Sequence, residues 1–328
     1  HISSWILIIV VLILMIASAG NLAADGPGAS RSFVSGNFFF ILDNARCGFV
    51  KSIDGGGISA EVINEPAGSS DFVKKHISQP KYEAFTAEIG FSMSKEIYNW
   101  ISESWAMNYK RHNGAIVAMD YTMKSKSEDQ FFNALITETT IPTCDGSSKE
   151  PSYIKIQFTP ELTRSAAPEV VDTGNYSKIE QKMWLPSNFR LVIDGLSCNK
   201  VNKIDSFTVK QTAVTDDIGD ARDYAKEPGK LEFPNLKITL AEVDAQSWYD
   251  WHKDFVVNGN NDESKEKDGY LAFFLPNMQK ELARIIFHNL GIFKISRDKS
   301  EANSDQIKRV TAELYCEKME FKYAGNVI

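Results

Sequence analysis

The chain has 328 residues, of which 43% are hydrophobic and 24% are charged, and its formal net charge is −7. This composition is typical of a globular protein and excludes a disordered chain. The acidic balance argues against a general nucleic-acid binder, because neutralising phosphates requires a basic surface. The length is sufficient for two domains of ordinary size.

Residues 1–20 contain an uninterrupted apolar run, "WILIIVVLILMIASAG", in which Ala17-Ser18-Ala19 matches the small-residue pattern of a cleavage site. The run is somewhat short for a spanning helix, which needs about 20 apolar residues. The sequence starts with His and no basic residue precedes the run, so two interpretations stay open. The segment is either a signal peptide for export or translated upstream sequence. Residues 21–34 are small and polar, which predicts a flexible lead-in.

The main clue in this sequence is an internal repeat. The stretch "NFFFILDNARCGFVKSID" begins at Asn37, and "NFRLVIDGLSCNKVNKID" begins at Asn188, 151 positions later. "YNW" at Tyr98–Trp100 and "YDW" at Tyr249–Trp251 have the same separation. We therefore expect two homologous copies, residues 35–164 and 184–328, joined by a small and polar linker, residues 165–183. The linker holds a sequon, Asn175-Tyr176-Ser177, which matters only if the protein is exported.

Alternating apolar residues predict strands in both copies. Phe38, Phe40 and Leu42 share one face, as do Phe189, Leu191 and Ile193 in the second copy. Further β-rich runs are Ala115–Met123, Phe131–Ile141 and Tyr153–Phe158. Near the end, the alternation changes phase after Lys318, which predicts a bulge or a turn there.

One amphipathic helix is expected in each copy. Ser94 is a candidate N-cap for the first helix and Asp244 for the second. The expected apolar stripes are Ile97, Trp100, Ile101 and Trp105, and Trp248, Trp251, Phe255 and Val256. At this helical spacing, Trp100, Trp105, Trp248 and Trp251 are interpreted as core residues that anchor each helix, rather than as sugar-stacking platforms. The expected fold is mainly β, with two tandem antiparallel barrels or sandwiches, each closed by one helix.

Motifs for catalysis or metal binding are lacking in the sequence. The five histidines are scattered without metal-ligand spacing, and the four cysteines form no C-x-x-C pair. Cys47 and Cys198 occupy equivalent places in apolar runs, which favours buried thiols, although disulfides stay open. Ser92–Lys95 matches S-x-x-K without its companion motifs. Asp54–Gly57 lacks the ending of a phosphate loop and indicates a turn. We expect a non-enzymatic protein with no cofactor and no metal.

Two long stretches, "FFFILDNARCGFVKSIDGGGISAEV" (Phe38–Val62) and "KKHISQPKYEAFTAEIGFSMSKEIYNWI" (Lys74–Ile101), resemble the tail-tube protein family of contractile phages and phage-tail-like particles. "GAIVAMDY" (Gly114–Tyr121) and "FFNALITETTIP" (Phe131–Pro142) continue the resemblance, which the second copy shares more loosely. Most members have one such unit, whereas this chain has two. The hydrophobic N-terminus is also foreign to the family.

The resemblance implies a structural subunit with a barrel-plus-helix fold, which assembles into sixfold rings stacked as a hollow tube. With two units per chain, three chains would close a pseudo-sixfold ring. The implied partners are copies of itself, sheath and baseplate proteins, and DNA or an effector as cargo in the lumen. The implied location is the tail tube of a virion or a phage-tail-like particle, assembled in the cytoplasm. The alternative is an exported β-sandwich binding module or adhesin, which the signal-like segment favours.

The residues themselves also indicate assembly through sheet edges. The run Phe131–Ile141 is long and carries no charge before Glu138, so pairing with a neighbour would satisfy an otherwise exposed edge. The candidate interface residues are Phe131 and Phe132 in this run, Asp54, Gly55, Gly56 and Gly57 in the glycine-rich turn, and Lys74, Lys75 and His76. The turn and the loop at Lys74–Lys81 are candidates for ring-to-ring contacts, with ordinary surface loops as the alternative.

Overall fold

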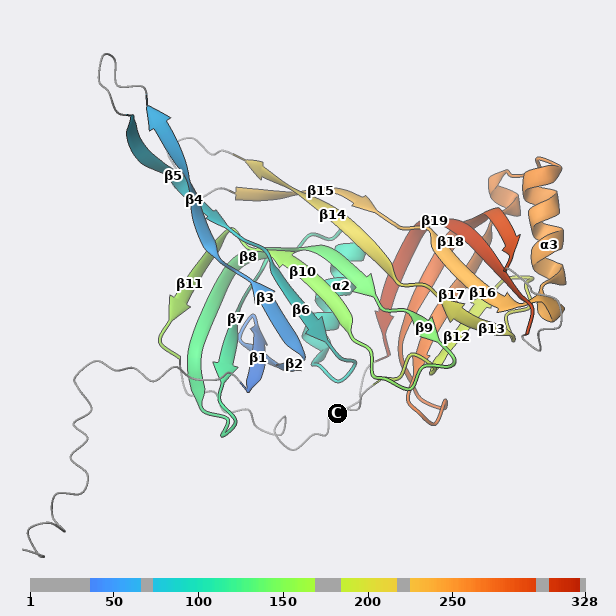
Figure 1. The fold of residues 1–328 in the computed structure, drawn as a ribbon, viewed down its shortest axis with the longest axis horizontal. Helices are drawn as coiled ribbons and strands as arrows, with labels where there is room; N and C mark the ends of the chain where they lie inside the picture. The colour runs from blue at the N-terminus through green and yellow to red at the C-terminus, as the bar shows by residue number, and fades with distance from the viewer. Residues whose placement is uncertain (1–35, 66–72, 169–183, 217–224, 299–306, 325–328) are drawn as a thin grey trace, which may run out of the picture. The chain divides into compact units, whose positions relative to one another are not determined.

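The computed structural model of the chain describes residues 36–65, 73–168, 184–216, 225–298 and 307–324. Antiparallel strands form a ten-stranded sheet, a seven-stranded sheet and a separate two-stranded hairpin (Figure 1), so the predicted mainly β fold is confirmed. The signal-like segment, the lead-in and the sequon at 175–177 lie outside the described residues. Among the helices of the described part, none is both long and apolar enough to cross a membrane.

The first repeat builds most of the ten-stranded sheet, in the order β2-β1-β7-β8-β10-β6-β3, and β11 also pairs with β8. Its elements are β1 (Asn37–Leu42), β2 (Ala45–Val50), β3 (Ser52–Gly55), β4 (Ile58–Glu65), β5 (Lys74–Tyr82), β6 (Phe85–Ile89), α2 (Lys95–Trp105), β7 (His112–Met119), β8 (Ser125–Ile141), β9 (Cys144–Asp145), β10 (Ile154–Thr159) and β11 (Leu162–Ala166).

The second repeat builds the seven-stranded sheet, in the order β12-β17-β18-β19-β16-β13-β9. Its elements are β12 (Phe189–Ile193), β13 (Val201–Ile204), β14 (Phe207–Asp216), β15 (Ala225–Glu232), β16 (Leu236–Ala241), the 3-10 turn η2 (Glu242–Asp244), α3 (Gln246–His252), the π-turn η3 (Lys253–Val257), the 3-10 turn η4 (Glu263–Lys265), β17 (Lys267–Phe274), β18 (Glu281–Arg297) and β19 (Arg309–Tyr323).

The two sheets repeat one strand order. The path β1-β7-β8-β10-β6-β3 of the first sheet corresponds to β12-β17-β18-β19-β16-β13 of the second. Mid-strand details recur as well: Asn133 in β8 and Asn289 in β18 both have left-handed backbones, with φ of 51° and 55°. Each backbone N–H donates to the side chain of an equivalent residue, Asn113 or Asp268. The two repeats thus share their strand order and these backbone hydrogen bonds. The residue boundaries of the two copies stay a prediction.

Strand alternation arises because successive side chains point to opposite faces of the sheet. In β1, Phe40 and Leu42 enter the main core, and Phe39 packs on the opposite face with Val117 and Met119. The bulge or turn that the phase change after Lys318 predicts is wrong. Strand β19 runs unbroken through this position and keeps its register with β18.

The phase change in β19 has a packing cause instead. The earlier part of the strand buries Leu314 within its own repeat, whereas Phe321 packs against Trp105 of helix α2 in the first repeat, with ring centroids 5.8 Å apart. Tyr98 of α2 also stacks on Tyr323 at 4.2 Å. The two ends of β19 are therefore buried on opposite faces.

Helix α2 begins directly after Ser94, which occupies the N-cap position, although its hydroxyl makes no capping hydrogen bond. The cap predicted for the second helix is wrong: α3 has Ala245 at the N-cap. Asp244 lies in the preceding 3-10 turn, and its carboxylate accepts a hydrogen bond from the Ser197 hydroxyl at 2.7 Å. That carboxylate is therefore held away from the first turn of α3.

The apolar stripe predicted for the second helix is also partly wrong. Phe255 is buried, but Val256 is 44% exposed. The chain leaves α3 through the π-turn η3, whose wider turn shifts the phase of the last residues. The sequence pattern assumes a uniform α-helix and therefore misplaces Val256.

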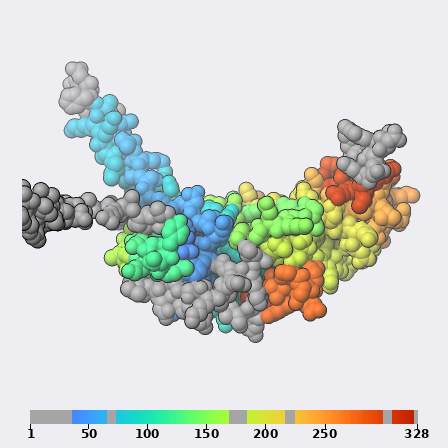
Figure 2. Space-filling view, turned by 60° about the horizontal axis from the view of Figure 1, so that its bottom comes forward, coloured from blue at the N-terminus to red at the C-terminus, as the bar shows by residue number. Residues whose placement is uncertain are grey.

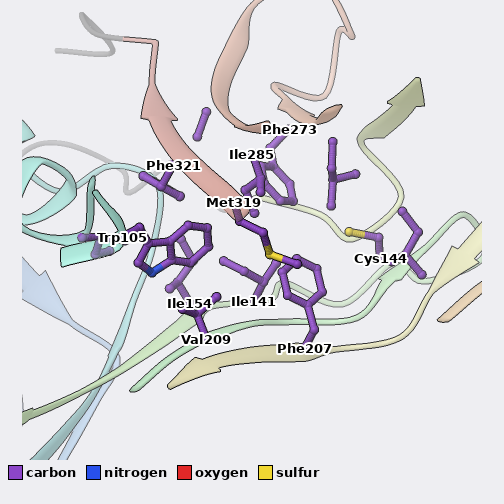
Figure 3. Close-up of a cluster of buried hydrophobic side chains, with 14 of the residues drawn as sticks. Trp105, Ile141, Cys144, Ile154, Phe207, Val209, Phe273, Ile285, Met319 and Phe321 are labelled. Atoms are coloured by element: carbon purple, nitrogen blue, oxygen red, sulfur yellow. The ribbon is translucent and has the colours of Figure 1, made fainter. Parts of the chain in front are cut away.

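One hydrophobic core spans both repeats (Figure 3). It includes Trp100, Trp105, Trp248 and Trp251, none of which is more than 7% exposed. All four cysteines are free thiols. Figure 3 shows residues of both repeats facing one another: Trp105, Ile141, Cys144 and Ile154 from the first, and Phe207, Val209, Phe273, Ile285, Met319 and Phe321 from the second.

Candidate assembly interface

A strand from the second repeat completes the sheet of the first. Strand β7 pairs with β8 only as far as Ala134, and β10 occupies the other side of β8. Beyond β7, residues 138–141 of β8 pair with the start of β14, in the register Phe207↔Ile141 to Lys210↔Glu138. We call residues 138–141 the first receiving edge and the β14–β15 pair the second hairpin. The run Phe131–Ile141, for which the sequence predicted pairing with a neighbouring molecule, therefore pairs with strands of its own chain.

The second hairpin packs firmly on the first repeat. Val209 is 2% exposed and Gln211 is 6% exposed. The Ser104 hydroxyl at the end of α2 donates to Gln211 Oε1 at 3.1 Å. Trp105 meets Phe233 edge to face, with ring centroids 6.5 Å apart. One face of this hairpin is therefore part of the core.

Several charged groups interact across this filled junction. Lys210 Nζ lies 3.5 Å from Glu138, which is its partner across the strands. Arg111 Nη2 donates to Glu227 Oε1 at 2.7 Å. The Lys226 backbone N–H donates to Glu161 Oε1 at 2.8 Å. Burial lowers the pKa of the Lys226 amine to about 8, against the opposing effect of Glu161.

The first repeat has an equivalent hairpin, β4–β5, which we call the first hairpin. Its register shift between Ala60 and Val62 matches that of the second hairpin between Gln211 and Ala213. Unlike the second hairpin, it forms a sheet of its own among the described residues and extends beyond β3 and β6 (Figures 1 and 2). The two hairpins thus share a shape but differ in what they pair with.

One face of the first hairpin is apolar and exposed. Residues paired across an antiparallel ladder share a face, and Ile58↔Tyr82, Ala60↔Pro80 and Val62↔Ile77 are such pairs. The exposed fractions of Ile58, Val62 and Ile77 are 58%, 61% and 67%. Large apolar side chains gathered on one exposed face indicate a binding surface.

The second repeat has the matching edge. Residues 294–297 of β18 are equivalent to 138–141 of β8, because Ser296↔Thr311 repeats the pair Thr140↔Lys155. Strand β17 pairs with β18 only up to Leu290. Within the described residues, no strand pairs with 294–297 on the side opposite β19. We call these residues the second receiving edge. Beside it, Phe293 is 40% exposed.

Two groups of the predicted interface residues lie on the first hairpin or directly before it. Asp54 and Gly55 end β3, and Gly56 and Gly57 connect it to β4. Lys74, Lys75 and His76 are exposed on β5, so the loop predicted at Lys74–Lys81 is wrong: this segment is a strand. Gly55 and Gly56 have φ of 88° and 78°, and a Cβ on Gly55 would collide with the Ala84 carbonyl oxygen. The glycines thus let the strand leave the ten-stranded sheet and enter the hairpin.

The other two predicted interface residues, Phe131 and Phe132, lie on β8. Phe131 is fully buried and packs on Phe158, with centroids 4.8 Å apart. Phe132 is half-buried beneath the Arg164 guanidinium. The exposed edge of β18 was missed in the sequence. The signal that could have found it is the equivalence of β18 with β8.

Comparison with known proteins gives results for structure alone. Neither a family model nor a curated protein matches this sequence. A chain from the extended sheath-tube complex of the extracellular contractile injection system PVC matches with 17% identity and a TM-score of 0.38, covering 43% of this chain and 95% of its own. Hcp1 from Flavobacterium johnsoniae matches with 15% identity and a TM-score of 0.24, covering 40% of this chain and 93% of its own.

A third solved chain, from the tube-terminating cap of the anti-feeding prophage, has 15% identity and a TM-score of 0.32, and covers 42% of this chain and 89% of its own. The first and third of these chains come from tubular particles by their own descriptions, an extracellular contractile injection system and the anti-feeding prophage. Because identities and TM-scores are this low, the proposals below rest on strand pairing within this chain.

Proposed function

We propose that the chain is a structural subunit of the tube type, which assembles with copies of itself. One observation carries this proposal. Among the described residues, the chain contains one filled junction between a hairpin and a receiving edge, and both halves of a second, equivalent junction are unpaired with each other. The first hairpin of one copy docks on the second receiving edge of the next copy, as the second hairpin docks on the first receiving edge.

The filled junction predicts the register of the proposed one. Replacing each residue by its equivalent turns Val209↔Thr139 into Ile58 opposite Ile295, and Lys210↔Glu138 into Ser59 opposite Lys294. The glycine-rich turn then lies against the end of β18, with Gly56 opposite Arg297. Main-chain hydrogen bonds supply affinity in such strand addition, and side chains supply specificity.

Burial of apolar side chains supports the same pairing. Val209 shows how deeply this position is buried once a hairpin is docked, and Ile58 is its exposed equivalent. Fully burying one such side chain contributes about 1.5–3 kcal/mol, so burial of Ile58 favours association. Val62 and Ile77 add less, because their equivalents Ala213 and Pro228 are only half-buried in the filled junction.

The interface is head-to-tail, and head-to-tail interfaces make rings when the rotation closes. Three chains would place six repeats in one ring, and stacked rings would form the wall of a tube. In this role the chain is non-enzymatic and is located in the tube of a virion or tail-like particle. Its partners are sheath and baseplate proteins, with DNA or an effector as cargo.

Electron microscopy of the purified chain, with and without residues 1–20, tests the proposal. Rings or tubes of uniform diameter are the expected result. A chain that stays monomeric at high concentration and binds glycans would contradict it and would favour an exported binding module.

A further inference from the structure

We propose that the two junctions carry different charge patterns, so that the second receiving edge selects the first hairpin of a second copy and rejects the second hairpin. This inference rests on the proposed function and identifies what makes its interface selective. It follows from two positions at which the repeats differ in charge.

The first position lies within the paired strands. In the filled junction, Lys210 of the second hairpin faces Glu138. In the proposed junction, Ser59 faces Lys294, which forms an ion pair with Glu313 at 2.6 Å inside its own chain. If the second hairpin docked on the second edge, Lys210 would face Lys294. Like charges directly opposite each other in a sheet are destabilising.

The second position lies beside the strands. Arg111 binds Glu227 in the filled junction. The equivalents are Glu266, which directly precedes β17 as Arg111 precedes β7, and His76, which aligns with Glu227 in the hairpin register. The carboxylate therefore moves from the hairpin to the edge, because Glu266 stands where the filled junction has Arg111 and His76 stands where it has Glu227. The wrong hairpin would place Glu227 against Glu266.

The surroundings of Glu266 strengthen this pattern. Tyr315 Oη donates to Glu266 at 2.5 Å, and burial together with Glu266 and Glu317 raises the pKa of that phenol. A pocket of about 490 Å³ beside Glu266 is lined by Asp194, Glu263, Glu266 and Asp268, with Lys267, Gly195 and Asn289. The first hairpin offers the complement, because Lys74 and Lys75 are exposed next to His76.

Specificity of this kind uses repulsion against wrong partners as well as attraction to the right one. In the first hairpin Lys75 and His76 would lie near Arg111 if that hairpin docked on the first edge. Both incorrect combinations therefore bring like charges together. The pattern also explains how two similar hairpins in one chain keep to separate edges.

Charge exchange at the first position tests the inference. Ser59 and Lys294 are both exposed, and the Lys294–Glu313 ion pair lies at the surface, where such pairs contribute little to stability, so these substitutions should leave the fold intact. Ser59→Lys is expected to raise the concentration needed for assembly roughly tenfold, because it places two ammonium groups opposite each other. Ser59→Lys combined with Lys294→Glu recreates the pair of the filled junction and should return assembly to the wild-type concentration or below. Sedimentation velocity over a range of protein concentrations measures the concentration at which each variant assembles.

Ser59→Ala is the matched control and should assemble as the wild type does. If Ser59→Lys assembles at the wild-type concentration, or if Lys294→Glu does not rescue it, the charge inference is wrong while ring assembly stands. If the wild-type chain forms no ring at any concentration, the proposed function fails and this inference fails with it.

Discussion

Val209 and Ile58 occupy equivalent places in the two hairpins, yet Val209 is 2% exposed and Ile58 is 58% exposed. The difference arises because the second hairpin lies on the first repeat, whereas the first hairpin pairs with no further strand among the described residues. A single chain thus shows the same junction in a filled and an open state.

Substitution by aspartate should have different effects at Val209 and at Ile58. Val209→Asp buries a carboxylate among Trp105 and its neighbours and should lower the free energy of unfolding by at least about 3 kcal/mol. Ile58→Asp should change it by less than about 0.5 kcal/mol, because that side chain is exposed, but should prevent assembly. Urea unfolding of the dilute chain and sedimentation at high concentration measure both effects. Equal destabilisation by the two variants would contradict the assignment.

Gly55→Ala should destabilise the chain by about 2 kcal/mol or more, because Gly55 has a left-handed backbone and the new Cβ collides with the Ala84 carbonyl oxygen. Gly259→Ala is the matched control: its φ of 75° is similarly left-handed, but a Cβ at this position would have no atom within 4 Å among the described residues. We expect this control to lose only about 1 kcal/mol. Thermal unfolding compares the two, and a larger loss for Gly259→Ala would overturn the explanation.

The lowered pKa of Lys226, about 8 against an ordinary 10.5, predicts a pH-dependent contribution to stability. Because the folded state binds this proton less tightly than the unfolded state does, the charged amine destabilises the fold below pH 8. That penalty fades as pH rises from 8 towards 10.5. Lys226→Met should therefore be more stable than the wild type at pH 7, by on the order of 1 kcal/mol once solvent screening is allowed for.

Urea unfolding of the wild type and of Lys226→Met at pH 7, 8, 9 and 10 gives the difference between their free energies of unfolding. Groups that titrate in both proteins contribute equally and drop out of this difference. The advantage of Lys226→Met should shrink steadily above pH 8. A stability advantage that is constant over this pH range would show that burial does not lower the pKa of the Lys226 amine.

The cysteines should react slowly and in a fixed order. Burial raises the pKa of Cys47 and Cys316 to about 12 and that of half-buried Cys198 to about 11, from 9.0, and raises that of Cys144 further. Only the thiolate reacts, so alkylation at pH 8 should be slow throughout and should label Cys198 first. Mass spectrometry of the native protein follows each site. Rapid labelling of Cys144 would contradict the core described above.

Local patterns in the sequence predicted the elements well. Alternation and β-rich runs predicted β1 and β12 and parts of β7, β8, β10 and β19, and helical spacing predicted α2 and the buried tryptophans, because these features depend on neighbours in the chain. Asp244 and Val256 were misplaced because a hydrogen bond from Ser197 and the π-turn η3 decide their positions. Both depend on tertiary packing.

The candidate interface was only partly predictable. The glycine-rich turn and Lys74–His76 stood out as unusual surface residues, and the structure places the turn directly before the first hairpin and Lys74–His76 on its strand β5. The pairing of β8 with β14 joins residues more than sixty positions apart, such as Ile141 and Phe207, and no local pattern encodes it. The second receiving edge follows only once this pairing is known.

Disulfide trapping tests the central claim most directly. The proposed register places Ile58 of one chain opposite Ile295 of the next, and directly opposed residues of antiparallel strands have the Cα spacing that a disulfide requires. Under mild oxidation, the double variant Ile58→Cys with Ile295→Cys should give a ladder of covalent species that ends at three chains. Ile58→Cys with Arg297→Cys, which is out of register, should not. No intermolecular disulfide in the first variant, or a ladder that continues past three chains, would contradict a closed ring of three.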